Sequence, residues 1–274
     1  MSDLSRLSLN QATVKYADLP GAVAACLRAE IPGIGLWREP VAEYGLRKTA
    51  ALLRETDLVP TSMCRGGFFT SPDSDQRIKD LADNRAAIDE CAELGVPELV
   101  LVSGGLPAGS QDIDGARALV LDSLAELAPY AGERGVRLAI EPLHPMFCSD
   151  RCVVATLDQA LDLAMHFPAE QVGVVVDTYH IWWDPNVYRA IERAAGRISA
   201  FQVCDWITPL PEGVLLGRGM MGDGCIELRR MRRAVDAAGY TGPIEVEIFN
   251  ETIWNTDPAE IAELTAARYL EHVH

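Results

Sequence analysis

Short apolar runs alternate with longer amphipathic segments along the whole chain. Each apolar run is four to seven residues long, which is the length of a buried strand and too short for a helix. The predicted strands are Leu7–Asn10, Gly33–Trp37, Thr61–Cys64, Leu99–Ser103, Arg137–Glu141, Gly173–Asp177, Ile198–Cys204 and Ile244–Phe249.

The segments between these runs have the residue spacing of amphipathic helices. Several of them stop at a glycine, as at Gly95 and Gly135, which is typical of the residue just past a helix C-terminus. Asp257 followed by Pro258 is typical of a helix start. The predicted helices are Leu19–Ala29, Val41–Glu55, Ser74–Leu94, Ile113–Arg134, Thr156–His166, Asn186–Ala195, Ile226–Ala238 and Pro258–Val273.

Strands that alternate with helices predict βαβ units and a parallel sheet, and hence an α/β fold. About eight repeats favour a closed (β/α)8 TIM barrel over an open doubly wound sheet. No G-x-G-x-x-G or Walker loop follows the first strand, which argues against a nucleotide-binding alternative. Because no linker or low-complexity segment interrupts the pattern, we expect residues 1–274 to form a single domain.

Composition limits the partners of such a barrel. The chain has 274 residues, of which 49% are hydrophobic, and a formal net charge of −16 that disfavours binding to nucleic-acid phosphates. Its seven cysteines form no C-x-x-C pair, so we expect free thiols in a reducing cytoplasm. The sequence has no recognisable signal peptide, lipidation motif or apolar run long enough for a membrane, so no membrane partner is expected.

Oxygen-bearing side chains stand at or near the ends of the last four predicted strands. Because side chains alternate in direction along a strand, all four can face the barrel axis. Buried carboxylates without a counter-charge are costly, and a divalent cation would remove that cost. Three carboxylates and one amide oxygen suit Mn²⁺, with Mg²⁺ or Co²⁺ as alternatives. The candidate metal ligands are Glu141, Asp177, Gln202 and Glu247.

Two arginine-based alternatives remain open at this point. Arg137 lies in the same strand as Glu141 and could neutralise that carboxylate, although it cannot readily serve all four groups. Glu245 lies one layer deeper than Glu247, where it either supports the ligands or pairs with an arginine.

The motifs around these residues resemble the xylose-isomerase-like TIM barrels, also described as sugar phosphate isomerase/epimerases. The resemblance covers essentially the whole chain and implies one divalent ion held by Glu141, Asp177, Gln202 and Glu247. It also implies that His180 touches the substrate. The motifs are Ile140-Glu-Pro-Leu-His144, Val176-Asp-Thr-Tyr-His180, Phe201-Gln-Val-Cys-Asp205, Gly222-Asp-Gly-Cys-Ile226 and Val246-Glu-Ile-Phe249.

Two positions depart from the ketose 3-epimerases of that family. The third ligand is a histidine in many of those enzymes, whereas Gln202 is similar to hydroxypyruvate-isomerase-like and dehydroshikimate-dehydratase-like members. Phe147 stands where the epimerases carry a substrate-binding glutamate. The superfamily match is therefore specific, but the substrate assignment is not.

Further candidates for substrate binding lie after the strands. A neutral imidazole can move a proton or donate to a substrate oxygen, an arginine can clamp a hydroxyl, carboxylate or phosphate, and a tryptophan can pack against a sugar ring. For each of these residues, the alternative is a structural role in a loop or in the core. The long segment Trp206–Gly224 contributes two of these residues and is typical of a functional loop. The candidates are His144, His180, Arg218, Arg65, Trp37 and Trp206.

These residues favour an isomerase or epimerase that moves a proton beside the carbonyl of a sugar or sugar-like ketone through a metal-stabilised enediolate. Glu141 and Glu247 are the candidate acid and base, with His180 as a further catalytic group. Loss of a β leaving group in place of reprotonation would give a lyase or dehydratase on the same site. A DNA-repair endonuclease would need more histidines and a basic face, and a barrel that only binds a partner is disfavoured by the intact ligand set. By analogy with the family, a homo-oligomer is expected.

Overall fold

A closed barrel of parallel strands forms the centre of the molecule. The computed structural model describes residues 3–211 and 213–274, and within them eight strands close in the order β1-β10-β7-β6-β5-β4-β3-β2. This confirms the predicted (β/α)8 architecture. The barrel strands are β1 (Leu7–Asn10), β2 (Gly33–Trp37), β3 (Val59–Gly67), β4 (Glu98–Val102), β5 (Arg137–Glu141), β6 (Val172–Asp177), β7 (Ile198–Val203) and β10 (Ile244–Val246).

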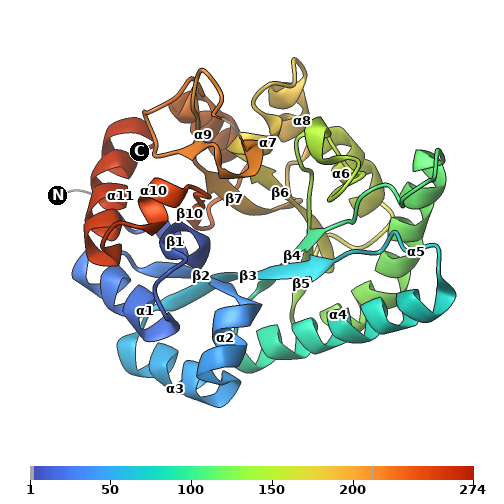
Figure 1. Ribbon diagram of the computed structural model, residues 1–274, viewed down its shortest axis with the longest axis horizontal. Coiled ribbons are helices and arrows are strands. Elements are labelled where there is room, and N and C mark those ends of the chain that lie inside the picture. The colour runs from blue at the N-terminus through green and yellow to red at the C-terminus, as the bar shows by residue number, and fades with distance from the viewer. Residues whose placement is uncertain (1–2, 212) are drawn as a thin grey trace.

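Helices surround the barrel on its outer side (Figure 1). In the described part of the chain, none of them is both long and apolar enough to cross a membrane. The helices are α1 (Leu19–Arg28), α2 (Arg38–Tyr44), α3 (Leu46–Thr56), α4 (Ser74–Leu94), α5 (Ile113–Gly132), α6 (Leu157–Ala164), α7 (Thr178–Ile181), α8 (Val187–Arg193), α9 (Leu228–Ala237), α10 (Glu251–Trp254) and α11 (Pro258–His272), with 3-10 turns η1 (Gln11–Val14), η2 (Pro145–Phe147) and η3 (Val214–Leu216).

Most predicted elements coincide with observed ones, and β5 and α4 have the predicted bounds. The single helix expected over Val41–Glu55 is wrong, because Gly45 separates α2 from α3. The φ of Gly45 is 101°, a conformation that glycine adopts without steric cost. The last barrel strand ends at Val246, so Glu247 follows the strand instead of lying within it.

Small side chains fill the barrel interior below its C-terminal rim. They form a cluster of their own, separate from the larger core between the barrel and its helices. Glu141, Asp177 and Gln202 each lie two residues beyond a member of this cluster and therefore face the same interior. The members of the inner cluster are Cys64, Val100, Ala139, Val175 and Ala200.

A short antiparallel ribbon extends from the rim. It consists of β8 (Asp205–Trp206) and β9 (Arg218–Gly219), with Trp206 opposite Arg218. The ribbon folds the long segment after β7 back toward the barrel, and this return brings Arg218 to the end of the strands.

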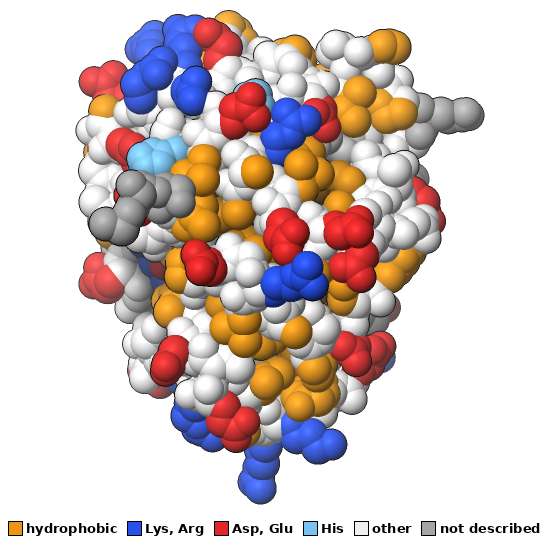
Figure 2. All heavy atoms as spheres, turned by 90° about the vertical axis from the view of Figure 1, so that its left-hand side faces the viewer, with side chains coloured by type: hydrophobic (Ala, Val, Ile, Leu, Met, Phe, Trp, Pro, Cys, Tyr) orange, Lys and Arg blue, Asp and Glu red, His pale blue; other side chains and the backbone are white. Residues whose placement is uncertain are grey.

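Figure 2 shows one side of the molecule, on which acidic and basic side chains are interspersed with hydrophobic atoms. On this face the acidic residues are scattered and do not gather around one place. The negative charge seen there is thus spread over the surface, which is the usual arrangement for solubility.

Candidate metal centre

Three carboxylates and one amide meet at the C-terminal rim of the barrel. Glu141 and Asp177 end β5 and β6, Gln202 lies opposite Asp177 in the register of β6 and β7, and Glu247 follows β10. All four residues are buried, with between 0% and 5% of their surface exposed. This rim is the face on which barrel enzymes carry their sites.

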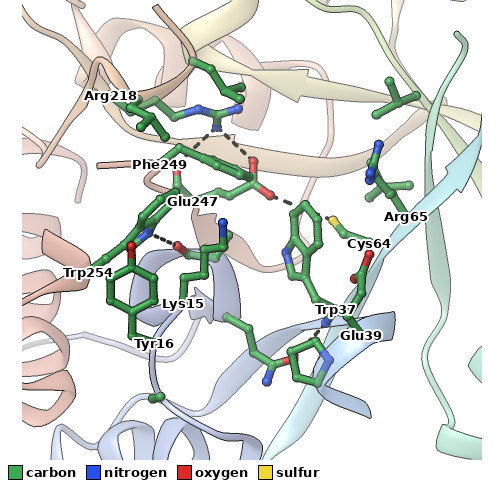
Figure 3. A pocket seen from close by; sticks show the side chains of 18 of the residues that line it. Lys15, Tyr16, Trp37, Glu39, Cys64, Arg65, Arg218, Glu247, Phe249 and Trp254 are labelled. Carbon is green, nitrogen blue, oxygen red and sulfur yellow. Dashed lines mark hydrogen bonds and ion pairs between the residues drawn. The ribbon is translucent and has the colours of Figure 1, made fainter. Parts of the chain in front are cut away.

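A cavity of about 1050 Å³ adjoins the cluster (Figure 3). Glu141, Glu247 and His180 border it on the side of the cluster, and Trp37 and Arg65 belong to its wall. The volume is at the upper end of that of small-molecule sites. The acidic cluster is therefore accessible to a ligand of that size.

Arg218 reaches into the cluster from the β8–β9 ribbon. Its Nη1 donates to Asp177 Oδ2 at 3.2 Å and to Glu247 Oε2 at 2.9 Å. Only 3% of the residue is exposed, and the aromatic rings of Tyr179 and Phe249 lie 4.9 and 4.8 Å from its guanidinium carbon. Arg218 is thus an internal counter-ion of the carboxylates.

Glu245 fixes the orientation of the Gln202 amide. Gln202 Nε2 donates to Glu245 Oε1 at 2.9 Å, so its carbonyl oxygen points away from that carboxylate. Glu245 also accepts hydrogen bonds from Asn10, Thr61 and Ser62, at distances between 2.7 and 3.0 Å. Glu245 makes no ion pair with an arginine in residues 3–211 and 213–274. Of the two roles expected for Glu245, it therefore has that of a residue that supports a candidate ligand, through its hydrogen bond with Gln202.

His180 joins the cluster from α7. Its Nδ1 accepts the main-chain N–H of His144 at 3.1 Å. Its Nε2 lies 3.8 Å from Asp177 Oδ2 and 3.9 Å from Glu141 Oε1. The imidazole is therefore held by the main chain on one side and faces the carboxylates on the other.

Burial dominates the electrostatics of these groups. It raises the pKa of Glu141 well above its usual range, and the charges of Glu247 and Asp177 add to the shift. Burial also raises the pKa of Glu247, to about 7, although Arg218 opposes the shift. Burial lowers the pKa of His180 well below its usual range. In the absence of a metal ion, this environment favours a protonated Glu141 and a neutral His180 at neutral pH.

The donor set fits a divalent cation. Glu141 Oε1 and Gln202 Oε1 are buried and accept no hydrogen bond from the described residues, which is a costly state for polar atoms. One ligand atom each of Glu141, Asp177 and His180 lie within 4.8 Å of one another. Carboxylate and amide oxygens bind Mg²⁺, Mn²⁺ and related ions, and an imidazole nitrogen such as that of His180 also binds other divalent metals.

Arg137 does not neutralise Glu141, so this alternative from the sequence is wrong. It begins β5, whereas Glu141 ends that strand. Its Nη2 lies 3.4 Å from the carbonyl oxygen of Gly196, to which it donates. Among the described residues, the arginine that pairs with the cluster is Arg218, from a segment distant in sequence.

The remaining candidates for substrate binding divide into two groups. Trp37 and Arg65 border the cavity, together with Arg218 and His180. Trp206 and the side chain of His144 do not border it: they pack against each other with ring centres 5.2 Å apart, and Trp206 lies 4.7 Å from Tyr179. The rings of these two residues therefore lie outside the cavity wall.

Two polar residues near the cluster were missed in the sequence. Asn10 donates to Glu245 and accepts the indole N–H of Trp37 at 2.7 Å. Cys64 borders the cavity with its Sγ 3.9 Å from Glu247 Oε1. Both lie at or near the C-terminal ends of predicted strands, so the positional rule used for the carboxylates would have found them.

The fold and the site together define the class of protein: a (β/α)8 barrel with a candidate metal centre at its C-terminal rim. The family model described as xylose isomerase-like TIM barrel matches residues 23–271. The chain therefore belongs to the xylose isomerase-like TIM barrel family.

Two curated relatives represent different reactions. An inosose isomerase of Bacillus velezensis is 25% identical over 217 residues, which cover 77% of this chain and 74% of that protein. A 3-dehydroshikimate dehydratase of Pseudomonas putida is 29% identical over 250 residues, which cover 85% of this chain and 36% of that protein. The chain thus spans about a third of the length of the dehydratase.

Two solved structures share the fold over nearly the whole chain. Protein SMc04130 from Sinorhizobium meliloti 1021 is 44% identical, with a TM-score of 0.96 and coverage of 99% of this chain and 100% of that one. The IolI protein, solved with a binding zinc atom, is 20% identical, with a TM-score of 0.86 and coverage of 98% of each chain. At that identity the second likeness shows the fold alone.

Proposed function

We propose that the protein is a divalent-metal-dependent isomerase or epimerase that transfers a proton next to the carbonyl of a sugar or sugar-like ketone. The observation that carries the proposal is the convergence of Glu141, Asp177, Gln202 and Glu247, with unpaired oxygens on Glu141 and Gln202, beside a cavity of about 1050 Å³. The inosose isomerase of Bacillus velezensis and its 25% identity support this reaction class.

The geometry favours Gln202 over His180 as the third ligand. When the N–H of His144 donates to His180 Nδ1, the ring proton of the neutral imidazole is on Nε2, whereas Arg218 Nη2, 3.1 Å from Nε2, favours the other tautomer as long as it stays there. A protonated Nε2 has no lone pair for a metal ion, whereas Gln202 Oε1 has its lone pairs free. His180 would then donate Nε2–H to a substrate oxygen.

The proposed chemistry divides between the ion and the chain. A divalent cation bound by Glu141, Asp177, Gln202 and Glu247 would polarise the substrate carbonyl and make the neighbouring C–H more acidic. Glu247 borders the cavity and would exchange a proton with that carbon. Glu141 borders the cavity from another strand and would deliver or remove the proton on another face of the carbon.

The ring of Trp37 belongs to the cavity wall, and its indole N–H is held by Asn10 at 2.7 Å. It would pack against the C–H face of a sugar-like ring. Arg65 borders the cavity with its guanidinium carbon 4.5 Å from the Phe68 ring centre, and it would hold a polar or anionic substituent. Mn²⁺ is the ion that we propose, with Mg²⁺ or Co²⁺ as alternatives, because the proposed ligands are all oxygens.

A lyase or dehydratase is the second candidate. The 29% identity to a 3-dehydroshikimate dehydratase over 85% of this chain favours it, as does Phe147 on the cavity wall. An apolar side chain there offers no hydrogen bond to a sugar hydroxyl. The same proton abstraction would then end in loss of a leaving group β to the carbonyl.

Solvent deuterium exchange tests both candidates. The protein is loaded with Mn²⁺ and incubated in D₂O with a panel of keto-sugars and cyclic polyol ketones, and products are followed by mass spectrometry and NMR. An isomerase or epimerase incorporates deuterium at the carbon next to the carbonyl, whereas a dehydratase removes the proton from that carbon, releases water and leaves a double bond there. Folded, metal-loaded protein that exchanges no proton of any panel member would contradict the proposed reaction class.

A further inference from the structure

Arg218 holds one carboxylate oxygen of each of two proposed metal ligands. Its Nη1 lies 3.2 Å from Asp177 Oδ2 and 2.9 Å from Glu247 Oε2. Asp177 Oδ1 already accepts the main-chain N–H of Tyr179 at 2.7 Å, so Oδ2 is the oxygen left for a cation. A guanidinium and a metal ion would compete for the same place.

The hydrogen bonds of Arg218 in this position are incomplete. Its Nε is buried and has no partner among residues 3–211 and 213–274. Its Nη2 lies 3.1 Å from His180 Nε2, and the main-chain nitrogen of His144 lies 3.1 Å from Nδ1, although a neutral imidazole can accept from only one of these two donors. At one of the two ring nitrogens an N–H group therefore faces another N–H group, which is unfavourable. The remaining contacts of the guanidinium are with the carboxylates of Asp177 and Glu247 and with the Glu247 carbonyl oxygen.

Only the side chain would have to move. The carbonyl oxygen of Arg218 accepts from Asn250 Nδ2 at 2.9 Å, and β9 is paired with β8. Arg218 also borders the cavity of about 1050 Å³, so a rotated guanidinium has space to occupy. The main chain can therefore stay in place while the charge leaves the carboxylates.

We propose that Arg218 is the counter-ion of the metal-free site and that a divalent cation displaces its guanidinium into the cavity. The inference rests on the proposed function, because it requires the same carboxylates to bind a metal ion. Without any positive charge, Asp177 and Glu247 would be buried and unpaired, which is strongly destabilising. With both positive groups present, the cation and the guanidinium repel each other at short range. Arg218 thus keeps the metal-free protein folded and lowers its affinity for metal.

Titration with Mn²⁺ tests this competition. Binding is measured by calorimetry and by the EPR signal of free Mn²⁺ on the wild type, Arg218→Gln and Arg151→Gln. Arg151 is the matched control, because it also borders the cavity but forms its ion pair with Asp150, at 3.5 Å. We expect Arg218→Gln to bind Mn²⁺ at least about tenfold more tightly than the wild type, and Arg151→Gln to stay within about twofold.

Thermal unfolding gives a second readout. Metal-free Arg218→Gln is expected to melt below the wild type and to gain more from added Mn²⁺. An Arg218→Gln protein that is folded by near-UV circular dichroism and binds Mn²⁺ no more tightly than the wild type overturns the proposal. If that variant does not fold, a crystal structure of the wild type with Mn²⁺ decides: the proposal requires Nη1 to leave Asp177 Oδ2, and a retained contact overturns it.

The two proposals fail in different ways. If folded wild type and folded variants bind none of Mn²⁺, Mg²⁺, Co²⁺ or Zn²⁺, the proposed function fails and this inference fails with it. If the wild type binds metal and Arg218→Gln leaves the affinity unchanged, only the role of Arg218 is wrong.

Discussion

The carboxylate of Glu245 accepts a hydrogen bond from the amide nitrogen of Gln202 at 2.9 Å. The contact decides which end of the Gln202 amide faces the other carboxylates. Because Glu245 Oε1 can only accept, the amide nitrogen must turn toward it and the carbonyl oxygen away from it. That oxygen is buried and unpaired among the described residues, which is the state expected of a metal ligand without its ion.

Glu245→Leu is therefore expected to weaken metal binding by about 10- to 100-fold without removing any proposed ligand. Leucine cannot hold the Gln202 amide, which is then free to turn. Glu245→Gln is the matched control: its carbonyl oxygen can still accept from Gln202, and its amide group can donate to the hydroxyls of Thr61 and Ser62. We expect that variant to stay within a few-fold of the wild type. Calorimetric Mn²⁺ titration of the folded variants measures the difference in affinity. Equal affinities of the two variants would show that Glu245 does not support metal binding.

The ligand positions could be predicted from the sequence because they follow from strand periodicity. Glu141 and Asp177 each end an apolar run, and parallel strands bring such ends to one rim. The same rule places Glu245 one layer deeper than Glu247. The hydrogen bonds of Glu245 with Asn10, Thr61 and Ser62 could not be predicted, because these residues come from strands that meet β10 or face it only once the barrel closes.

Arg218 shows what the sequence could not provide. It lies in a long segment without periodicity, so its side chain could be interpreted only as a solvated arginine or a substrate clamp. The strands β8 and β9, which bring Arg218 to the carboxylates, are each two residues long. Strands this short have no recognisable alternation of apolar and polar residues in the sequence. The close approach of Gly35 to Glu245 could not be predicted from the sequence either. A Cβ atom at Gly35 would lie 2.6 Å from a Glu245 carboxylate oxygen.

Glu141→Gln and Glu247→Gln are each expected to lower turnover by at least about a hundredfold, because the amide can neither take nor return a proton. Circular dichroism should show an intact fold, since glutamine has the shape of glutamate. Stopped-flow or mass-spectrometric measurement of deuterium exchange gives the rates. A variant that exchanges protons at close to the wild-type rate would remove its residue from the mechanism.

His180→Ala is expected to lower activity by roughly 10- to 100-fold and to leave Mn²⁺ bound, because the N–H of His144 holds its ring as a donor. Metal content after gel filtration, measured by atomic emission, distinguishes the roles. Loss of the metal from folded His180→Ala would make His180 a ligand, and the role of Gln202 would then have to be given up.

The two tryptophans predicted to bind substrate should behave differently. Trp37 borders the cavity, so Trp37→Ala is expected to raise KM by about tenfold through loss of ring contact. Trp206 is 8% exposed and packs on Tyr179 and His144, so Trp206→Phe is expected to lower the melting temperature by a few degrees and to change KM little. Steady-state kinetics and thermal unfolding of the two variants measure this split. A large KM effect in Trp206→Phe, with stability unchanged, would place that ring in the substrate site.

Stability should depend on pH through Glu98, which lies at the other end of the barrel strands from the metal centre. Burial raises the pKa of Glu98 to about 8, although Arg137 and Ser199 oppose the shift. Between its usual value of 4.5 and about 8, the folded chain keeps a proton that the unfolded chain has lost. The free energy of unfolding therefore falls as the pH rises through this window.

Glu98→Gln removes this dependence, because glutamine is neutral at every pH. In urea unfolding of metal-free protein, we expect the variant to match the wild type near about pH 5 and to exceed it near about pH 8 by roughly 1–3 kcal/mol. The control is Glu55→Gln at an exposed position of α3, which should leave the pH profile of the wild type unchanged. Glu141 and Glu247 also have raised pKa values, so the test is the difference between variant and wild type and not the profile of either one. A difference that is the same at both pH values would mean that Glu98 is already ionised in the folded protein at the lower pH.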